Sequence, residues 1–233
     1  MKYSIKVNSI NSKEGSNIKG FATVVFGDNL KITNIAILEN KEKDQLFISM
    51  PRYKSSERDE SGAIIYKDVC NPITAEFREE LYTNILGAYE RAIAPEQEQV
   101  QESGKGMKRS VDMLEFSVTV SQYEKDGSNI KGLARIYIEE SFIVNNVNIL
   151  QGKENIFVSM PAYKTKQIDE QGKAIYQDVC YPVTKEFREK LYAEIIREYE
   201  QAKEKSQNQV RDTVEKPVGS RVNQHEKEAT PFC

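Results

Sequence analysis

The sequence predicts an α+β fold that is built twice, each copy being a mostly antiparallel sheet of four or five strands followed by a C-terminal helix. Three observations predict it. A long segment recurs at a constant offset of 110 residues, with 25 identities among the 44 positions of 47–90. Apolar and polar residues alternate through the first part of each copy, which is typical of strands. In the last part of each copy, apolar residues recur at helical spacing.

The repeat is clearest in two motifs. Phe47-Ile-Ser-Met-Pro-Arg-Tyr-Lys54 returns as Phe157-Val-Ser-Met-Pro-Ala-Tyr-Lys164, and Ile65-Tyr-Lys-Asp-Val-Cys-Asn-Pro72 returns as Ile175-Tyr-Gln-Asp-Val-Cys-Tyr-Pro182. A repeat of this length indicates two domains, each large enough to bury its own core. We therefore expect a first repeat over residues 1–92, a linker over 93–112, a second repeat over 113–203 and a disordered polar tail over 204–233.

Each copy begins with strands. In the first copy an alternating run at 3–7 leads through a Gly-Ser-Asn turn into the apolar run 18–26, which indicates a hairpin. Runs at 30–38 and 46–50 follow, and the second ends at a proline that cannot donate to a ladder. A polar loop containing Gly62, or Gly172 in the second copy, then interrupts the sheet. Such loops often carry function.

A helix closes each copy. Thr74 and Thr184 are N-cap candidates, and apolar residues follow at a spacing of four. These are Phe77, Leu81, Ile85 and Tyr89 in the first copy, and Phe187, Leu191, Ile195 and Tyr199 in the second. The stripe is typical of a helix packed on a sheet. Because a lone sheet of this size leaves edge strands to cover, we expect the two copies to pair within the chain as a pseudo-dimer.

Composition limits the classes of function. The chain has 39% hydrophobic and 30% charged residues, a net charge of −3 and no apolar run of membrane-spanning length, so we expect a cytoplasmic globular protein without a membrane partner. Cys70 and Cys180 occupy equivalent positions, are expected to be buried, and have no metal-binding spacing. The only histidine, His225, lies in the expected tail, which argues against catalysis that depends on histidine. We expect no enzyme activity, no metal and no small-molecule cofactor.

The order of the motifs resembles the SpoVG family (septation protein SpoVG). The resemblance covers a hairpin with Ile-Lys-Gly, a strand end Phe-Ile-Ser-Met-Pro, a glycine-containing loop, Tyr-Lys-Asp-Val-Cys-Asn-Pro-Ile-Thr and a closing helix, and it extends over both repeats. It implies a bacterial protein that forms dimers, binds DNA and RNA, regulates gene expression and affects septation and sporulation.

The resemblance also implies a binding surface. Arg78 and Arg188 match the arginine of a helix-start segment implicated in DNA contact, although acidic residues flank both, and one cation is kept after the strand-ending proline, at Arg52. An arginine one turn into a helix can hold a phosphate near free backbone N–H groups. The candidate nucleic-acid-binding residues are Arg52, Tyr53, Lys54, Arg78, Tyr163, Lys164, Lys166 and Arg188.

The residues leave alternatives open. Arg78 and Arg188 can instead form exposed ion pairs while nearby glutamates complement the helix dipole. The whole protein can be a nucleic-acid-binding regulator, with Tyr53 and Tyr163 stacking on bases, or a protein-interaction module that kept the fold. An enzyme is the third alternative, since Asp68 and Asp178 recur before Val-Cys, but no second catalytic group recurs beside them.

Overall fold

The computed structural model describes residues 1–10, 15–94, 113–123 and 125–214. The first repeat runs in the order β1 (Tyr3–Ser9), β2 (Ile18–Phe26), β3 (Leu30–Asn40), β4 (Gln45–Ser49), β5 (Arg52–Arg58), β6 (Ile64–Asp68), β7 (Cys70–Pro72) and α1 (Ala75–Ile93). The second runs in the order β8 (Phe116–Gln122), β9 (Ile130–Ile138), β10 (Phe142–Gln151), β11 (Ile156–Ser159), β12 (Ala162–Ile168), β13 (Ala174–Asp178), β14 (Cys180–Pro182) and α2 (Lys185–Val214). Neither helix is both long and apolar enough to cross a membrane.

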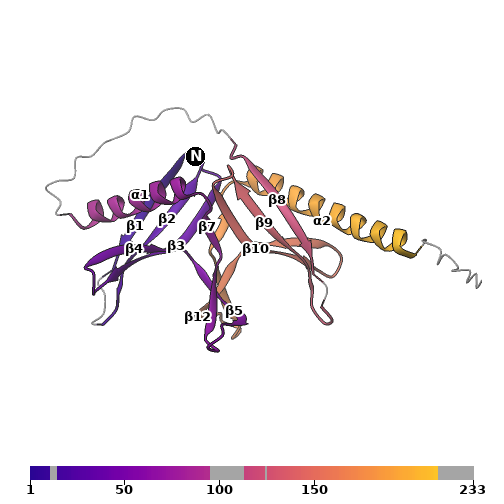
Figure 1. Cartoon of the computed structure of the whole chain (residues 1–233), viewed down its shortest axis with the longest axis horizontal. Coiled ribbons are helices and arrows are strands. Elements are labelled where there is room, and N and C mark those ends of the chain that lie inside the picture. The colour runs from indigo at the N-terminus through magenta and orange to yellow at the C-terminus, as the bar shows by residue number, and fades with distance from the viewer. Residues whose placement is uncertain (11–14, 95–112, 124, 215–233) are drawn as a thin grey trace, which may run out of the picture.

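Two five-stranded antiparallel sheets, each backed by one helix, form the body of the molecule (Figure 1). In the first sheet β1, β2 and β3 lie side by side, and the outer edge of β3 pairs with β4 and with β14 of the second repeat. In the second sheet β8, β9 and β10 lie side by side, and β10 pairs with β11 and with β7 of the first repeat. Each sheet therefore contains one strand exchanged from the other repeat.

The strand exchange is reciprocal at the level of single hydrogen bonds. The backbone N–H of Thr33 donates to the carbonyl of Val179 over 2.8 Å, and that of Asn145 donates to the carbonyl of Val69 over 2.7 Å. Buried backbone groups need such partners, because an unpaired one costs free energy. In this structure the two repeats thus pair within one chain.

The predicted α+β class and the helical stripes are confirmed. Both sets of four apolar residues are buried between helix and sheet, and the hydroxyl of Thr74 accepts a hydrogen bond from the N–H of Phe77 over 3.3 Å, as an N-cap does. The apolar cores of the two repeats meet at the centre, where the ring centroids of Phe26 and Phe142 are 4.9 Å apart in a tilted arrangement. Both rings are fully buried, and the buried apolar residues of the two repeats form one continuous core.

Two expectations need correction. The polar segments that contain Gly62 and Gly172 were expected to be loops, but they belong to two-stranded hairpins formed by β5 with β6 and by β12 with β13. The helix α2 continues to Val214, so residues 204–214 of the expected disordered tail are helical; this stretch contains no proline or glycine to end a helix. Of the linker expected over 93–112, residue 93 is the last of α1, and residues 95–112 lie outside the described residues. The end of the expected tail from 215, with His225 and Cys233, also lies outside them.

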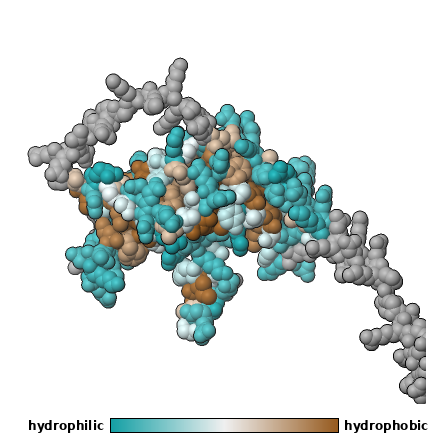
Figure 2. Space-filling model, turned by 45° about the horizontal axis from the view of Figure 1, so that its top comes forward, coloured by the Kyte–Doolittle hydropathy of each residue, from teal (hydrophilic) through white to brown (hydrophobic). Residues whose placement is uncertain are grey.

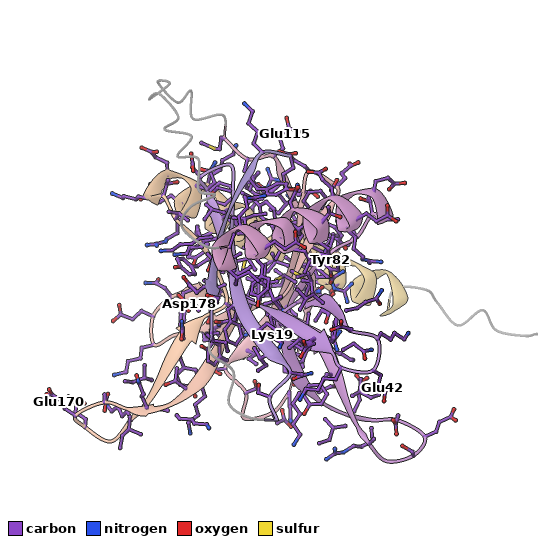
Figure 3. The ribbon with its side chains drawn as sticks, turned by 90° about the vertical axis from the view of Figure 1, so that its left-hand side faces the viewer. Lys19, Glu42, Tyr82, Glu115, Glu170 and Asp178 are labelled. Atoms are coloured by element: carbon purple, nitrogen blue, oxygen red, sulfur yellow. The ribbon has the colours of Figure 1, made fainter. Side chains whose placement is uncertain are left out.

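The two hairpins, which we call the first arm (52–68) and the second arm (162–178), project away from the sheets on the side opposite the helices (Figure 1). They overlap at the centre in that view. Seen from the side, they point to opposite sides of the molecule, with Glu170 at the tip of the second arm (Figure 3). Neither arm belongs to a main sheet, so its side chains are largely exposed.

Candidate functional site

Each arm ends in a tight turn that is stabilised by hydrogen bonds. In the first arm the carboxylate of Asp59 accepts from the N–H groups of Ser61 and Ala63, both over 2.9 Å, and Gly62 has a φ of 81° that favours glycine. The hydrogen bond from the Ser61 hydroxyl is the largest influence that lowers the pKa of Asp59. Asp169 makes the equivalent bonds in the second arm. The sequence therefore folds both arms as ordered hairpins.

The strand register decides which side chains share a face of an arm. Lys54 lies opposite Tyr66 in the first arm, and Lys164 lies opposite Tyr176 in the second. Residues directly opposite one another in an antiparallel pair point to the same side and interact. All four side chains are exposed. Each arm thus presents a lysine beside a tyrosine.

Tyr66 and Tyr176 were missed as candidates from the sequence. Their side chains are 58% and 64% exposed, whereas Tyr163, the other exposed tyrosine in the described residues, is 39% exposed. The segment Ile-Tyr-Lys-Asp before the exchanged strand reads as an ordinary half-buried strand, and the sequence gives no sign that this strand leaves the main sheet. The one available signal was their identity in both repeats within a polar segment.

The predicted tyrosines Tyr53 and Tyr163 lie on the opposite face of the arms from these two. The hydroxyl of Tyr53 lies 3.5 Å from Oδ1 of Asn146 in the second repeat, and its ring is half-buried. The hydroxyl of Tyr163 donates to Oε1 of Gln177 in its own arm over 2.6 Å. Tyr53 therefore belongs to the contact between the repeats, whereas Tyr163 stays 39% exposed.

The predicted cations fall into two groups. Lys54, Lys164 and Lys166 are exposed on the arms and have no ion-pair partner within the described residues. Arg52 is exposed but its Nε lies 2.9 Å from Oδ1 of Asp68. Surface pairs of this kind contribute little stability, yet they occupy a donor that a phosphate would use.

Arg78 and Arg188 lie at the starts of the two helices. The guanidinium of Arg78 donates to the carbonyl of Pro72 over 3.1 Å, and that of Arg188 reaches the carbonyl of Pro182 over 3.5 Å. Both prolines end exchanged strands. The ion pairs considered from the sequence are not found for either arginine in the described residues, and both side chains remain exposed with donors to spare.

The roots of the arms and the helix starts form one polar region. Tyr82 belongs to α1 (Figure 3), and burial raises the pKa of its phenol while the charges of Arg78, Asp68 and Arg52 also act on it. In the second repeat burial likewise raises the pKa of the corresponding tyrosine, Tyr192. The structure thus brings Arg52 and Arg78 around one tyrosine, while the arm lysines lie beyond them along the hairpin.

The two cysteines do not contribute a thiol to the surface of this region. Cys70 and Cys180 are fully buried in the exchanged strands, and burial raises the pKa of both thiols far above the ordinary value. A thiol that stays protonated is a poor nucleophile and a poor metal ligand. Their position in β7 and β14 agrees with the interpretation of a small buried hydrophobe.

Charge on the arms is balanced. The first arm carries four basic and four acidic residues, and the second carries three of each. In Figure 2 the arms form the projection below the sheets, largely hydrophilic with an apolar patch. The surface therefore combines unpaired lysines, exposed tyrosines and carboxylates, and it is not a continuous basic stripe.

The comparisons with known proteins agree with the repeat structure. The family model SpoVG matches the chain twice, over residues 1–91 and 113–201. A relative from Caldanaerobacter subterraneus subsp. tengcongensis, named "Putative septation protein SpoVG", is 28% identical over 83 residues, which cover 36% of this chain and 85% of the relative.

A relative of the same name from Phytoplasma australiense is 32% identical over 73 residues, covering 31% of this chain and 70% of the relative. One from Treponema denticola is 25% identical over 87 residues, covering 37% of this chain and 87% of the relative. Each relative thus corresponds to about one repeat. The chain belongs to the SpoVG family, and it carries two copies of the family's domain in tandem.

Proposed function

We propose that this protein is a nucleic-acid-binding regulator that contacts DNA or RNA through the two arms and the adjacent helix starts. The observation that supports this most strongly is the pairing of an exposed lysine with an exposed tyrosine across the strands of each arm. Lysines neutralise phosphates and aromatic rings stack on bases, so the two side chains serve the two parts of a nucleotide.

The proposal assigns roles to residues. Lys54, Lys164 and Lys166 contact phosphates, Arg78 and Arg188 add phosphate contacts from the helix starts, and Arg52 contributes in exchange for its pair with Asp68. The balanced charge of the arms makes the electrostatic part of binding modest. No catalytic step is part of the proposal, and we place the activity in the bacterial cytoplasm, in gene regulation connected with septation or sporulation.

The proposal includes the pairing of the two repeats in solution. The exchanged strands β7 and β14 supply the backbone partners for β10 and β3, and a tether between the repeats raises their effective concentration. Multi-angle light scattering should report a mass near the 26.7 kDa of one chain, with a compact radius. A mass of two chains would instead indicate exchange between molecules.

A protein-interaction module remains the second candidate, and one observation favours it. An open groove of about 560 Å³ lies between β11 and α2 and is lined mostly by apolar residues, with Arg197 and Glu200 at its side. Its apolar residues include Phe157, which is 48% exposed. Exposed apolar surface beside a strand edge is typical of protein contacts.

A titration of labelled DNA and RNA oligonucleotides across a salt series tests the proposal. The unaltered chain should bind, and log K should fall linearly with log salt because phosphate contact releases counterions. The triple variant Lys54→Ala, Lys164→Ala, Lys166→Ala should bind more weakly on every sequence and lose roughly 2 to 3 units of salt slope. The matched control is Lys41→Ala with Lys153→Ala, which removes exposed lysines outside the arms.

The double variant Arg78→Ala with Arg188→Ala extends this test to the helix starts. If both arginines contact phosphate, this variant should have a salt slope roughly 2 units lower than that of the unaltered chain. An unchanged slope would mean that the two arginines bind only the carbonyls of Pro72 and Pro182 and do not contact phosphate. Absence of binding by the unaltered chain at low salt would contradict the proposed function and leave the interaction module as the better account.

A further inference from the structure

The two arms share a length and a register but differ in how their charges are engaged. In the first arm Arg52 pairs with Asp68, and Lys67 pairs with Glu57 over 2.5 Å. The residues that correspond to Arg52 and Lys67 in the second arm are Ala162 and Gln177, so neither ion pair can form. Two of the four basic residues of the first arm are therefore paired within it, whereas the lysines of the second arm have no ion-pair partner in the described residues.

Available lysines cluster on one strand of the second arm. Lys164 and Lys166 lie two residues apart on β12, and neither has an ion-pair partner within the described residues. The first arm has a serine at the position of Lys166. The second arm thus presents two lysines where the first presents one.

The second arm also exposes more apolar surface. Tyr176 is 64% exposed opposite Lys164, and Ile168 is 68% exposed at the end of β12. The corresponding residues of the first arm are Tyr66 and the charged Arg58. Covering such apolar side chains with a ring or a base is favourable, because it removes apolar surface from water.

These side chains suit unpaired bases better than a duplex. In a double helix the faces of the bases are stacked on their neighbours, and only their edges are reached from the grooves. A two-stranded ribbon can enter the major groove, but it then needs polar groups for base edges and an excess of positive charge for the phosphates. The second arm has an exposed tyrosine and isoleucine, and its basic and acidic residues are equal in number. A flat ring beside lysines instead matches the stacking surfaces used for single strands.

We propose that the second arm is the principal contact of this protein with single-stranded nucleic acid, with Tyr176 stacking on an unpaired base while Lys164 and Lys166 contact the flanking phosphates. The first arm contributes less, because two of its four basic residues, Arg52 and Lys67, are paired within it and it has a serine at the position of Lys166. This inference rests on the proposed function, which it makes more specific. It applies to DNA and RNA alike, since stacking and phosphate contact use groups that both share.

The test measures fluorescence anisotropy of the full chain with a labelled mixed-sequence 20-mer, as DNA and as RNA, single-stranded and annealed to its complement at the same salt. Single strands should bind at least about tenfold more tightly than duplexes. Tyr176→Ala should weaken binding of the single strand by about five- to a hundredfold, which is the usual effect of removing a stacking ring. Tyr176→Phe should bind nearly as well as the unaltered chain, since it keeps the ring.

The matched variant is Tyr66→Ala, at the equivalent position of the first arm, and its effect should be several-fold smaller. Tyr176→Ala should leave the salt slope unchanged, whereas Lys164→Ala should reduce it by about 0.7 for a single strand. Equal binding of duplex and single strand, or equal losses for Tyr66→Ala and Tyr176→Ala, would overturn this inference while the proposed function stands. No binding of any oligonucleotide would overturn both.

Discussion

The exchanged strands and the arms are neighbours in the sequence. The two exchanged strands are nearly alike in sequence, whereas the two arms differ at many positions. In β7 and β14 the cysteine and the proline are identical, and only the middle residue differs, Asn71 against Tyr181. The backbone hydrogen bonds to the carbonyls just before the two cysteines differ by only 0.1 Å between the repeats. In the arms Arg52 is replaced by Ala162, and with it an ion pair is lost.

The difference shows where physical constraint acts. A residue in an exchanged strand must fill a buried site and satisfy the backbone of the other repeat, so few substitutions are tolerated. A residue on an arm faces water, where most substitutions change stability by less than about 0.5 kcal/mol. The two arms of one chain can therefore differ in sequence while the centre keeps both repeats together.

The largest effect is expected from a change at the shared centre. Phe142→Ala removes a fully buried ring that contacts Phe26 across the two repeats and should lower the free energy of unfolding by about 3–5 kcal/mol in a urea titration. The matched control is Phe157→Ala, at a ring that is 48% exposed, which should cost less than about 1 kcal/mol. A similar cost for both variants would mean that the centre does not hold the repeats together.

An intermediate effect is expected at the helix caps, where the repeats agree in geometry. The hydroxyls of Thr74 and Thr184 each accept from a backbone N–H over 3.3 Å. Thr74→Ala and Thr184→Ala should therefore each lower the free energy of unfolding by about 1 kcal/mol. Thermal or urea unfolding of the two variants measures this directly. A clear inequality between them would show that the likeness of the repeats does not extend to the energies of their helices.

The smallest effect is expected in the arms. Arg52→Ala should cost less than about 1 kcal/mol because its pair with Asp68 is largely exposed to solvent. Ala162→Arg places an arginine opposite Asp178 in the same register and should gain no more than that amount. Both changes in stability should shrink in 1 M salt, since exposed charges are screened. A salt-independent change of several kcal/mol would show that the arms contribute substantially to the stability of the fold.

The sequence was sufficient for the fold class, the helical stripes and the family. Alternation at 3–7 and the spacing of four from Phe77 to Tyr89 reflect burial on one face, which local sequence encodes directly. The arms could not be predicted in the same way, because β5 and β12 bury too little for a period of two to show. Their strand pairing depends on a turn at Gly62 or Gly172, and these glycines also suit an open loop.

The strand exchange could not be predicted from local sequence patterns either, for a different reason. Cys70-Asn-Pro72 and Cys180-Tyr-Pro182 are so similar that either could fill the free edge of either sheet. Only the three-dimensional path of the chain selects between them. The candidate site is affected in turn: the roles of Lys54, Lys164 and Lys166 stay predictions, and the exposure of Tyr66 and Tyr176 follows from the position of the arms outside both sheets.

The exchanged strand β14 also sets the order of events during synthesis. The first sheet has β1 to β4 once residue 49 has been made, but its fifth strand is residues 180–182. At about 5–20 residues per second, the stretch of about 130 residues from 50 to 182 takes roughly 7–27 s to translate. Throughout that interval the free edge of β3 is open to the equivalent strand of another nascent chain on the same messenger, so the spacing of ribosomes helps to decide whether the protein closes on itself or joins its neighbour.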